Sequence, residues 1–278
     1  MVRIRAMSPE DLSTAMRLSK EAGWNQVEAD WRRFLLMEPE GCFVAESGGV
    51  VIGTTVSCTF GTTAWLAMVL VARAERGRGV ATRLSRHAVG WLEGRGVGTI
   101  RLDATPAGQP IYEKLGFDVQ YELARYAGEL AFLERDSGAE PASQDELSKL
   151  LELDQRVTRT ARAKWLTALF TAWPEAVRVV RREGEILGFA AARRRAQAVQ
   201  VGPCVGNADA GPMLLHDAGR RYDGQAVYLD VPLLNPAAAL QAEGMGLRVQ
   251  RHLVRMWRGE PVCEDVRQLW SSSGPEMG

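Results

Sequence analysis

The chain has 278 residues, enough for one large domain or two ordinary ones, and its 46% hydrophobic and 24% charged content predicts a well-packed core. Its 34 Lys and Arg residues balance 34 Asp and Glu residues, so net charge gives no reason to expect a nucleic-acid or membrane partner. Three histidines and four widely spaced cysteines without a CxxC pair argue against a metal site. The longest apolar run, 65–72, is too short to span a bilayer. We therefore expect a cytoplasmic protein.

The residue pattern of the first 130 residues predicts two helices, followed by strands connected by tight turns. Ser8, Pro9 and Asp11 are residue types typical of a helix start, and a second helix follows Asn25. Strands are expected over 41–47, 50–60, 62–72, 98–105 and 117–129, with helices after Val80 and over 110–115. The stretch 62–72 is almost continuously apolar, which indicates a strand buried on both faces.

A polar linker around Pro141 begins a new unit, so we expect a boundary between Arg135 and Ser143 and two domains, 1–135 and 144–278. The second domain repeats the first in the same order. Segments 183–192, 227–232 and 246–260 resemble 47–56, 99–106 and 116–129, with Gly188 opposite Gly53. Three ordered matches predict a duplicated fold.

The stretch RGRGVA, 76–81, lies between a predicted strand and a predicted helix. Such a turn exposes backbone N–H groups at the start of a helix, where the helix dipole favours an anion, and Gly77 and Gly79 allow a phosphate to approach closely. The spacing fits neither GxxxxGK[ST] nor GxGxxG. From these residues alone, an ordinary turn with solvated arginines explains the pattern equally well.

A family resemblance favours the anion site. VLVARAERGRGVATRL resembles the acyl-CoA-binding segment of the GNAT N-acetyltransferase superfamily, whose Arg/Gln-x-x-Gly-x-Gly/Ala signature is matched by Arg76, Gly79 and Ala81. PIYEKLGF, 110–117, is similar to the tyrosine-bearing helix of that superfamily. The resemblance covers residues 1–130, and the whole chain resembles a two-domain subgroup with a divergent C-terminal domain. It implies an α/β (α+β) fold of tandem GNAT-like domains, each with a mixed, mostly antiparallel sheet flanked by helices.

The resemblance also implies roles for individual residues. Tyr112 matches the general acid that protonates the departing CoA thiolate, although a core tyrosine would look the same. The end of the strand before the turn is implied to pair with the pantetheine arm, and the turn to hold the pyrophosphate. The implied cofactor-binding residues are Val69, Leu70, Val71, Arg76, Gly77, Arg78, Gly79, Val80, Ala81 and Thr82.

The general base is less clear, because 62–72 contains no carboxylate. Asp103 on the next strand is the candidate, but Asp230 repeats it in the second half, which favours a structural role. A water chain or an amine that arrives neutral would also suffice. Trp24 and Asn25 lie where acceptors commonly bind in relatives, although Asn25 could simply cap the second helix.

The second half lacks the features of a site. Opposite RGRGVA it has VGPCVGNADAG, with no arginine before the glycines, and opposite Tyr112 it has the alanines and leucine of PAAALQ. We expect a degenerate domain that shapes the acceptor pocket.

The expected function is transfer of an acetyl group from acetyl-CoA, without a metal, to a primary amine of a small molecule or peptide, by a monomer or homodimer. Alternatives are a longer acyl donor, such as propionyl- or succinyl-CoA, and a non-catalytic CoA-binding sensor or scaffold. A nucleic-acid binder that uses the arginine runs ranks last.

Overall fold

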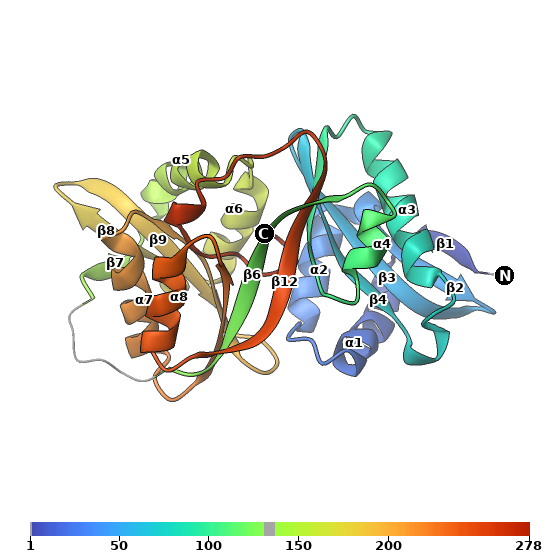
Figure 1. The fold of residues 1–278 in the computed structure, drawn as a ribbon, viewed down its shortest axis with the longest axis horizontal. Helices are drawn as coiled ribbons and strands as arrows, with labels where there is room; N and C mark the ends of the chain where they lie inside the picture. The colour runs from blue at the N-terminus through green and yellow to red at the C-terminus, as the bar shows by residue number, and fades with distance from the viewer. Residues whose placement is uncertain (1, 131–136) are drawn as a thin grey trace. The chain divides into compact units, whose positions relative to one another are not determined.

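The computed structural model describes residues 2–130 and 137–278, which divide into two compact units (Figure 1). Unit 1 contains the chain up to Val119 together with Met256–Pro261, and unit 2 contains Gln120–Arg255 together with Val262–Gly278. The expected first domain, 1–135, differs from unit 1 because residues 120–130 belong to unit 2. The expected end at Arg135 lies outside the described residues.

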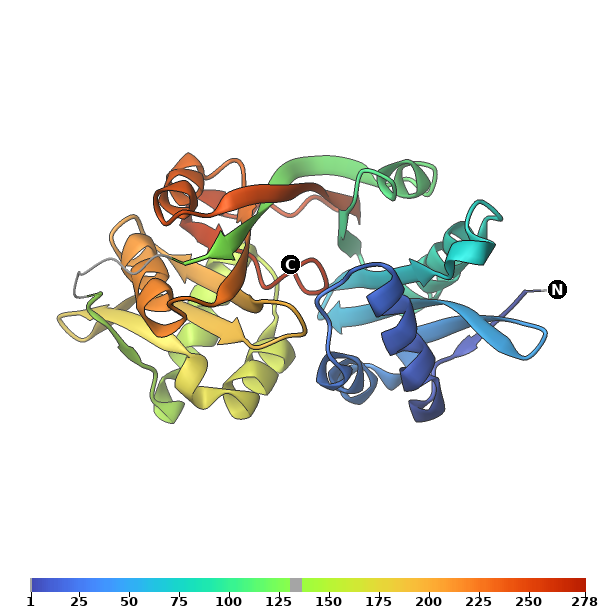
Figure 2. The ribbon, with the colours of Figure 1, turned by 90° about the horizontal axis from the view of Figure 1, so that it is seen from below.

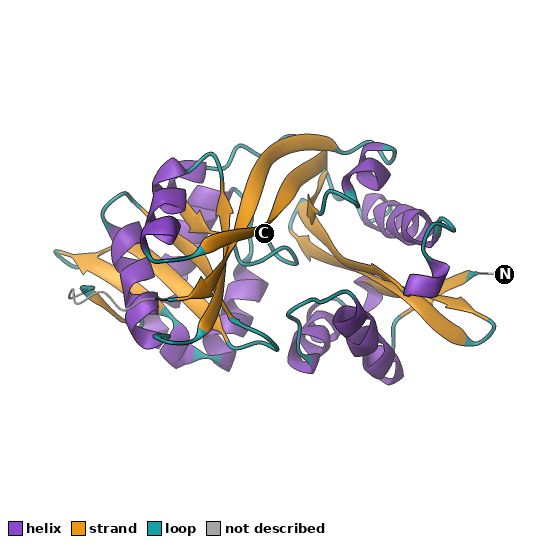
Figure 3. Cartoon of the chain, turned by 60° about the horizontal axis from the view of Figure 1, so that its bottom comes forward, coloured by secondary structure: helices purple, strands orange, loops and turns teal. Residues whose placement is uncertain are grey.

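Unit 1 is a mixed sheet with helices on both faces (Figure 3). Its strands are ordered β1-β2-β3-β4-β5, followed by the end of β12, and the pairing of β4 with β5 is parallel. The elements are β1 (Arg3–Ala6), α1 (Leu12–Glu21), α2 (Glu28–Met37), β2 (Cys42–Ser47), β3 (Val50–Phe60), β4 (Thr63–Val71), α3 (Val80–Glu93), β5 (Thr99–Ala104), α4 (Gln109–Glu113) and the last residues of β12 (Arg248–Gly259). The sequence predicts these elements except β1, which carries too few apolar residues to be recognised as a strand.

Carboxylates start both N-terminal helices. The Ser8 N–H donates to Asp11 Oδ2 at 2.8 Å, which caps the 3-10 turn before α1 as the sequence predicted. The cap of α2 is Val27, whose N–H donates to Asp30 Oδ2 at 3.0 Å. The capping role considered for Asn25 is therefore wrong, and Asn25 is buried two residues before the cap.

Strand β4 pairs with β3 along its length but with β5 only at its start, so one edge of its second half is unpaired by β5. β4 pairs in parallel with β5 from Thr63 to Trp65. Met68 then has a left-handed backbone, φ 55°, at a register shift in the β3–β4 ladder. Left-handed backbone is uncommon outside glycine, and strained positions of this kind cluster at functional sites. Beyond Met68 the end of β4 still pairs with β3, where Val71 lies opposite Gly53.

Unit 2 repeats this architecture with strand order β6-β11-β10-β9-β8-β7, and β12 runs beside β6 (Figures 1 and 2). The parallel pair is now β10 with β11. The elements are β6 (Asp118–Glu129), β7 (Ala139–Pro141), α5 (Leu147–Thr158), α6 (Ala163–Ala172), β8 (Arg178–Arg182), β9 (Glu185–Arg193), β10 (Val199–Gly206), α7 (Ala210–Arg221), β11 (Ala226–Pro232), α8 (Pro236–Gly244) and β13 (Leu269–Ser271).

Two glycines support the duplication that the sequence predicted. A Cβ added to Gly53 would lie 2.8 Å from the Leu70 carbonyl oxygen and 3.0 Å from a methyl of Leu84 on α3. A Cβ added to Gly188 would lie 2.8 Å from the carbonyl oxygen of Val205 and 2.9 Å from the Ala210 side chain on α7. Both glycines therefore allow the same close approach of strand, strand and helix, which explains why Gly188 stands opposite Gly53.

A buried ion pair joins two strands of unit 2. Arg125 on β6 lies opposite Asp230 on β11 and binds it through two hydrogen bonds of 2.8 and 2.7 Å, and both side chains are almost fully buried. Burial alone would raise the pKa of Asp230, but Arg125 and Gln200 hold that pKa below its ordinary value. The pair therefore stabilises the fold above the pKa of an unfolded aspartate, and this stabilisation is lost as pH falls through the folded pKa.

Removing one partner of this pair is expected to be costly. Arg125→Ala leaves Asp230 buried without its counter-charge, so we expect a loss of about 3–5 kcal/mol in the free energy of unfolding, measured with urea. The double variant Arg125→Met/Asp230→Leu removes both charges and is expected to lose much less. If Arg125→Ala lost no more stability than the double variant, the pair would not be energetically coupled.

Candidate active site

A cleft of about 680 Å³ opens in unit 1 where β4 ends and α3 begins. It is bounded by the end of α1, the end of β4, the glycine turn, the start of α3 and the segment that leads into α4. Its lining residues are Glu21, Ala22, Trp24, Val69, Leu70, Val71, Arg73, Glu75, Arg76, Gly77, Gly79, Val80, Ala81, Thr82, Thr105, Ala107, Gly108 and Ile111. Of the ten residues predicted to bind a cofactor, nine line this single cleft, and Arg78 does not.

The turn before α3 has the geometry that an anion requires. Gly77 and Gly79 have φ values of 76° and 75°, which glycine adopts without strain, and a Cβ at either position would meet no other atom within 4 Å. The space beside both glycines is therefore open. The first helical bond of α3 runs from Arg83 N to Gly79 O, so the N–H groups before Arg83 are available at the positive end of the helix dipole.

The arginines of the turn are partly engaged by the protein. Arg76 Nε donates to the Val71 carbonyl oxygen at 3.1 Å, which fixes the turn against the end of β4. Arg78 pairs with Glu75 at 3.0 Å and is well exposed, so it contributes at most a screened charge. Arg76, unlike Arg78, lines the cleft.

Tyr112 is a buried residue of the short helix α4. Its carbonyl oxygen accepts from the N–H groups of Leu115 and Phe117, and its ring meets the Phe117 ring edge-on at a centroid distance of 5.8 Å. Burial raises the pKa of the Tyr112 phenol well above its ordinary value, and Ser85 on α3 offsets this only in part. The phenol therefore keeps its proton at ordinary pH. Tyr112 itself does not line the cleft, but its neighbours Gly108 and Ile111 do.

The predicted acceptor and base residues are distributed differently. Trp24 lines the cleft, whereas Asn25 and Asp103 are not among the described residues that line it. The cleft does contain two carboxylates, Glu21 and Glu75, which the sequence analysis did not single out. Glu21 is the last residue of α1, and only the fold shows that this helix end lies beside β4.

In unit 2, the matching groove is filled by the chain itself. β13 pairs antiparallel with β10 at Cys204 and Val205, which correspond to the end of β4 in unit 1. The indole of Trp270 donates to the Gly206 carbonyl oxygen at 3.0 Å and lies against α7, where a Cβ added to Gly211 would be 1.9 Å from the ring. The loss of the site in the second copy stays a prediction, which this geometry supports.

Comparisons with known proteins identify the class. The sequence profile of the Acetyltransferase (GNAT) family matches residues 9–117, and that of an Acetyltransferase (GNAT) domain matches residues 150–271, so together they match more than half of the chain. The chain belongs to the GNAT acetyltransferases, has two GNAT domains and is an acyltransferase.

Individual relatives agree with this assignment. The chain is 23% identical over 259 residues to holothin acyltransferase from Pseudoalteromonas sp. (strain SANK 73390), covering 92% of this chain and 87% of that protein. A crystal structure assigned as an acetyltransferase from Pyrococcus horikoshii is 21% identical with a TM-score of 0.85, covering 100% of this chain and 96% of that one. A tandem GNAT protein from the clavulanic acid biosynthesis pathway is 14% identical with a TM-score of 0.65, covering 94% and 99%. The two solved structures support the fold.

Among residues 2–130 and 137–278, no helix combines the length and apolar character needed to cross a membrane. In the same residues, no three His, Cys, Asp or Glu side chains gather in a way that could hold a metal ion.

Proposed function

We propose that unit 1 transfers an acetyl group from acetyl-CoA to a primary amine. One observation carries this proposal: the end of β4, the glycine turn, the start of α3 and the approach to α4 line one cleft. These are the parts that the family resemblance assigns to pantetheine, pyrophosphate and the reacting thioester. Their meeting in one space supports acetyl-CoA as the ligand over a plain turn.

The residues of the chain fit that ligand. The N–H groups at the start of α3 would bind the pyrophosphate, with Gly77 and Gly79 leaving room for it. The backbone of Val69–Val71 would pair with the pantetheine amides, in the manner of a strand added to a sheet edge. Backbone N–H groups of the same segment would stabilise the oxyanion that forms during transfer.

In the reaction, the amine nitrogen bonds to the acetyl carbon and the carbon–sulfur bond breaks, leaving CoA as a thiolate. Tyr112 would donate the proton that this thiolate takes up. Its buried phenol is protonated at ordinary pH, as such an acid must be. A core role for Tyr112 is the competing explanation, and the kcat of Tyr112→Phe distinguishes the two.

The acceptor would enter beside Trp24. Glu21 lies at the same end of the cleft and carries a carboxylate that can attract an ammonium group or take up its proton. Glu21 also pairs with Arg17 one turn earlier at 2.5 Å, an exposed contact that contributes little and partly neutralises the carboxylate. We therefore propose Glu21 as the acceptor contact, in preference to Asn25, and as a stronger candidate base than Asp103.

This assignment predicts different behaviour for two isosteric variants. Glu21→Gln is expected to lower kcat/KM for the amine about 10–100-fold, because it removes the carboxylate from the cleft but keeps the shape of the side chain. Asp103→Asn is expected to stay within about threefold of wild type, since it changes a side chain outside the cleft lining. Initial rates as a function of amine concentration and pH measure both. If kcat/KM fell more in Asp103→Asn than in Glu21→Gln, Asp103 would be the general base instead of Glu21.

A longer acyl donor is the second candidate, because the relative with 23% identity is named an acyltransferase and not an acetyltransferase. An assay of CoA release with acetyl-, propionyl- and succinyl-CoA against small amines, amino acids, aminoglycosides and peptides tests both versions. Turnover fastest with acetyl-CoA supports the proposal, and turnover only with a longer donor replaces it. Binding of CoA without turnover of any pair would favour a sensor or scaffold. Location in the cytoplasm and a monomeric or homodimeric state remain expectations.

A further inference from the structure

Arg258, next to the end of β12, binds the turn that follows the tyrosine-bearing helix α4. Its Nη1 donates to the Leu115 carbonyl oxygen at 2.7 Å, across 143 positions of the sequence. Residues 256–261 belong to unit 1, so the contact lies within one unit. A backbone carbonyl group needs a hydrogen-bond partner, and a guanidinium has several donors with which to supply one. A residue from a distant part of the sequence therefore holds the turn after α4.

The same turn is bonded directly to Tyr112. The Tyr112 carbonyl oxygen accepts from the Leu115 N–H at 2.9 Å and from the Phe117 N–H at 3.0 Å. α4 has only 5 residues, too few for a helix to be stable without contacts from the rest of the protein. The position of Tyr112 therefore depends on what holds the turn that follows it.

Arg258 is itself fixed from two sides. Its Nε and Nη2 donate to Oε1 of Glu93, the last residue of α3, at 3.1 and 2.7 Å. Both side chains are partly exposed, so this ion pair contributes little to stability and instead orients the guanidinium. The backbone of the segment is anchored as well, because the Glu260 N–H donates to the Gly98 carbonyl oxygen at 3.2 Å and Thr99 Oγ1 donates to the Glu260 carbonyl oxygen at 2.6 Å. One guanidinium thus connects α3, which begins at the glycine turn, with the end of α4.

The second copy of the fold has a glycine at this place. Gly128 is the counterpart of Arg258 in the repeat, since each follows its matching glycine, Gly116 or Gly246, by about twelve positions. A Cβ added to Gly116 would lie 2.5 Å from Arg258 Nη1, and a Cβ added to Gly128 would lie 3.7 Å from the Gly246 carbonyl oxygen, so both residues occupy the same corner of their unit. The helix before this corner in unit 2, α8, contains no tyrosine. The arginine therefore occurs in the copy that has the tyrosine, and the glycine in the copy that lacks it.

We propose that Arg258 positions Tyr112 so that its phenol can donate a proton to the departing thiolate, an assignment that rests on the proposed function. Arg258 is not among the described residues that line the cleft, so it acts through the turn after α4 and not on a bound ligand. A catalytic group that is displaced by about 1 Å can lose about 100-fold in rate. Loss of the Arg258 contact should therefore lower kcat and leave the affinity for acetyl-CoA nearly unchanged.

The direct test follows the Tyr112 ring by NMR in the intact protein, labelled with tyrosine that carries ¹³C at the ζ carbon. The chain has 5 tyrosines, and the Tyr112 resonance is assigned by its loss in Tyr112→Phe. Arg258→Met keeps a long side chain but removes every donor, so we expect the Tyr112 resonance to shift or broaden. Arg95→Met is the matched control: Arg95 also forms a partly exposed ion pair, with Glu40, just after α3, but within the described residues it makes no hydrogen bond to the turn after α4. It should leave the Tyr112 resonance as in wild type.

A second measurement shows whether the effect on the reaction passes through Tyr112. Arg258→Met is expected to lower kcat about 10–100-fold, while the Kd for acetyl-CoA changes less than about twofold. In the Tyr112→Phe background the same substitution should cause no further fall, because the group that Arg258 positions is already absent. Arg258→Lys has one ammonium group for two partners and is expected to recover part of the lost kcat.

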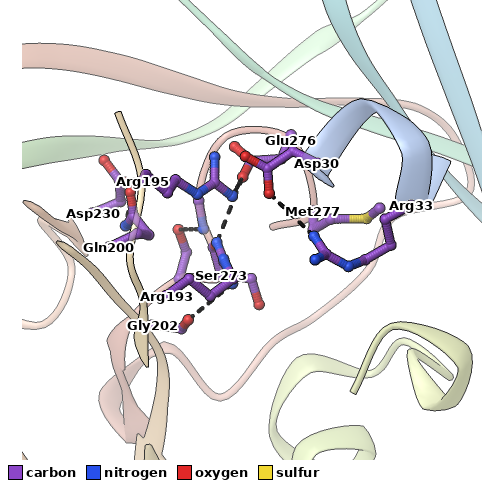
Figure 4. A network of polar contacts seen from close by, with 12 residues as sticks. Asp30, Arg33, Arg193, Arg195, Gln200, Gly202, Asp230, Ser273, Glu276 and Met277 are labelled. Carbon is purple, nitrogen blue, oxygen red and sulfur yellow. Dashed lines mark hydrogen bonds and ion pairs between the residues drawn. The ribbon is translucent and has the colours of Figure 1, made fainter. Parts of the chain in front are cut away.

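An arginine of unit 2 controls for a general loss of stability. Arg193 is buried, donates to the Gly202 carbonyl oxygen at 3.2 Å and lies 3.5 Å from Glu276 Oε1 (Figure 4). Removing one partner of a buried ion pair is strongly destabilising, so Arg193→Met is expected to lower the urea unfolding midpoint more than Arg258→Met does. The Tyr112 resonance of Arg193→Met should nevertheless match that of wild type.

An unchanged Tyr112 resonance in Arg258→Met would overturn the proposal, and so would an equal fall of kcat in the wild-type and Tyr112→Phe backgrounds. A shift of that resonance in Arg193→Met as large as in Arg258→Met would also overturn it, because lost stability would then explain both. If no pair of substrates turned over, or if Tyr112→Phe kept its kcat, the proposed function would fail on its own. The resonance would still decide whether Arg258 holds the Tyr112 ring in place.

Discussion

Gly79→Glu is expected to abolish acetyl-CoA binding, whereas the wild-type protein is expected to bind one molecule per chain in a calorimetric titration. Gly79 has φ 75° at the point where α3 begins, so any side chain strains the turn there. A glutamate also puts a negative charge where the pyrophosphate would bind. We expect the affinity to fall at least about 100-fold, because both the backbone N–H donors and the local potential change.

Gly96 provides the matched control for this variant. It also has φ 75° and, like Gly79, has no atom within 4 Å of an added Cβ, but it follows the end of α3 and does not line the cleft. Gly96→Glu therefore introduces the same backbone strain and the same charge away from the site. Equal losses of affinity in both variants would mean that backbone strain, and not the loss of the pyrophosphate site at the turn, is responsible. Two acetyl-CoA molecules bound per wild-type chain would contradict a filled groove in unit 2.

Tyr112→Phe is expected to lower kcat about 10²–10⁴-fold while the affinity for acetyl-CoA changes less than about twofold. Phenylalanine keeps the ring that packs against Phe117 and removes only the proton donor. Single-turnover rates and calorimetric binding measure the two quantities separately. Tyr222→Phe is the control, because Tyr222 is also a buried tyrosine but belongs to unit 2. A kcat near wild type in Tyr112→Phe would make Tyr112 a core residue.

The raised pKa of Tyr112 sets the sign of the pH dependence. A general acid works in its protonated form, which is present below its pKa, and burial moves the pKa of Tyr112 upward. The decline of kcat at alkaline pH that reports this group should therefore lie above the ordinary phenol value of about 10. A decline in kcat between neutral pH and about pH 10 that disappears in Tyr112→Phe would contradict this expectation. It would mean that the Tyr112 phenol has an ordinary or lowered pKa and is less shielded from water.

Much of unit 1 follows from local sequence. The glycine turn, the apolar run of β4 and the helix after Val80 have strong residue preferences, so their places along the chain could be predicted. The local sequence does not predict that the turn, the end of β4 and the approach to Tyr112 lie close together. That prediction comes from the family resemblance, which assigns all three to one acyl-CoA site. All the proposed cofactor-binding residues except Arg78 line one cleft, and their contact with a cofactor stays a prediction.

Contacts between distant parts of the chain could not be predicted in this way. Residues 256–261 belong to unit 1, where the Glu260 N–H donates to the Gly98 carbonyl oxygen at 3.2 Å and Arg258 pairs with Glu93 at 2.7 Å. A prediction that divides the chain into consecutive domains cannot detect a segment that belongs to the first unit but follows the second along the chain. Likewise, Glu21 ends an amphipathic helix like any surface residue, and only the three-dimensional fold places it in the cleft.

Because of strand β13, we expect the stability of the two units to depend differently on dissolved ligands. A segment tethered beside its own groove acts as an intramolecular ligand, with an effective concentration on the order of millimolar or more, so the groove of unit 2 stays filled whatever is dissolved around it. Among the described residues of unit 1, no segment of the chain occupies the cleft in this way, and a diffusible ligand that binds there would add to the stability of unit 1 as RT ln(1 + [L]/Kd). With acetyl-CoA as that ligand, the supply of activated acyl groups would set how long unit 1 resists unfolding and proteolysis, while unit 2 remains a constant support.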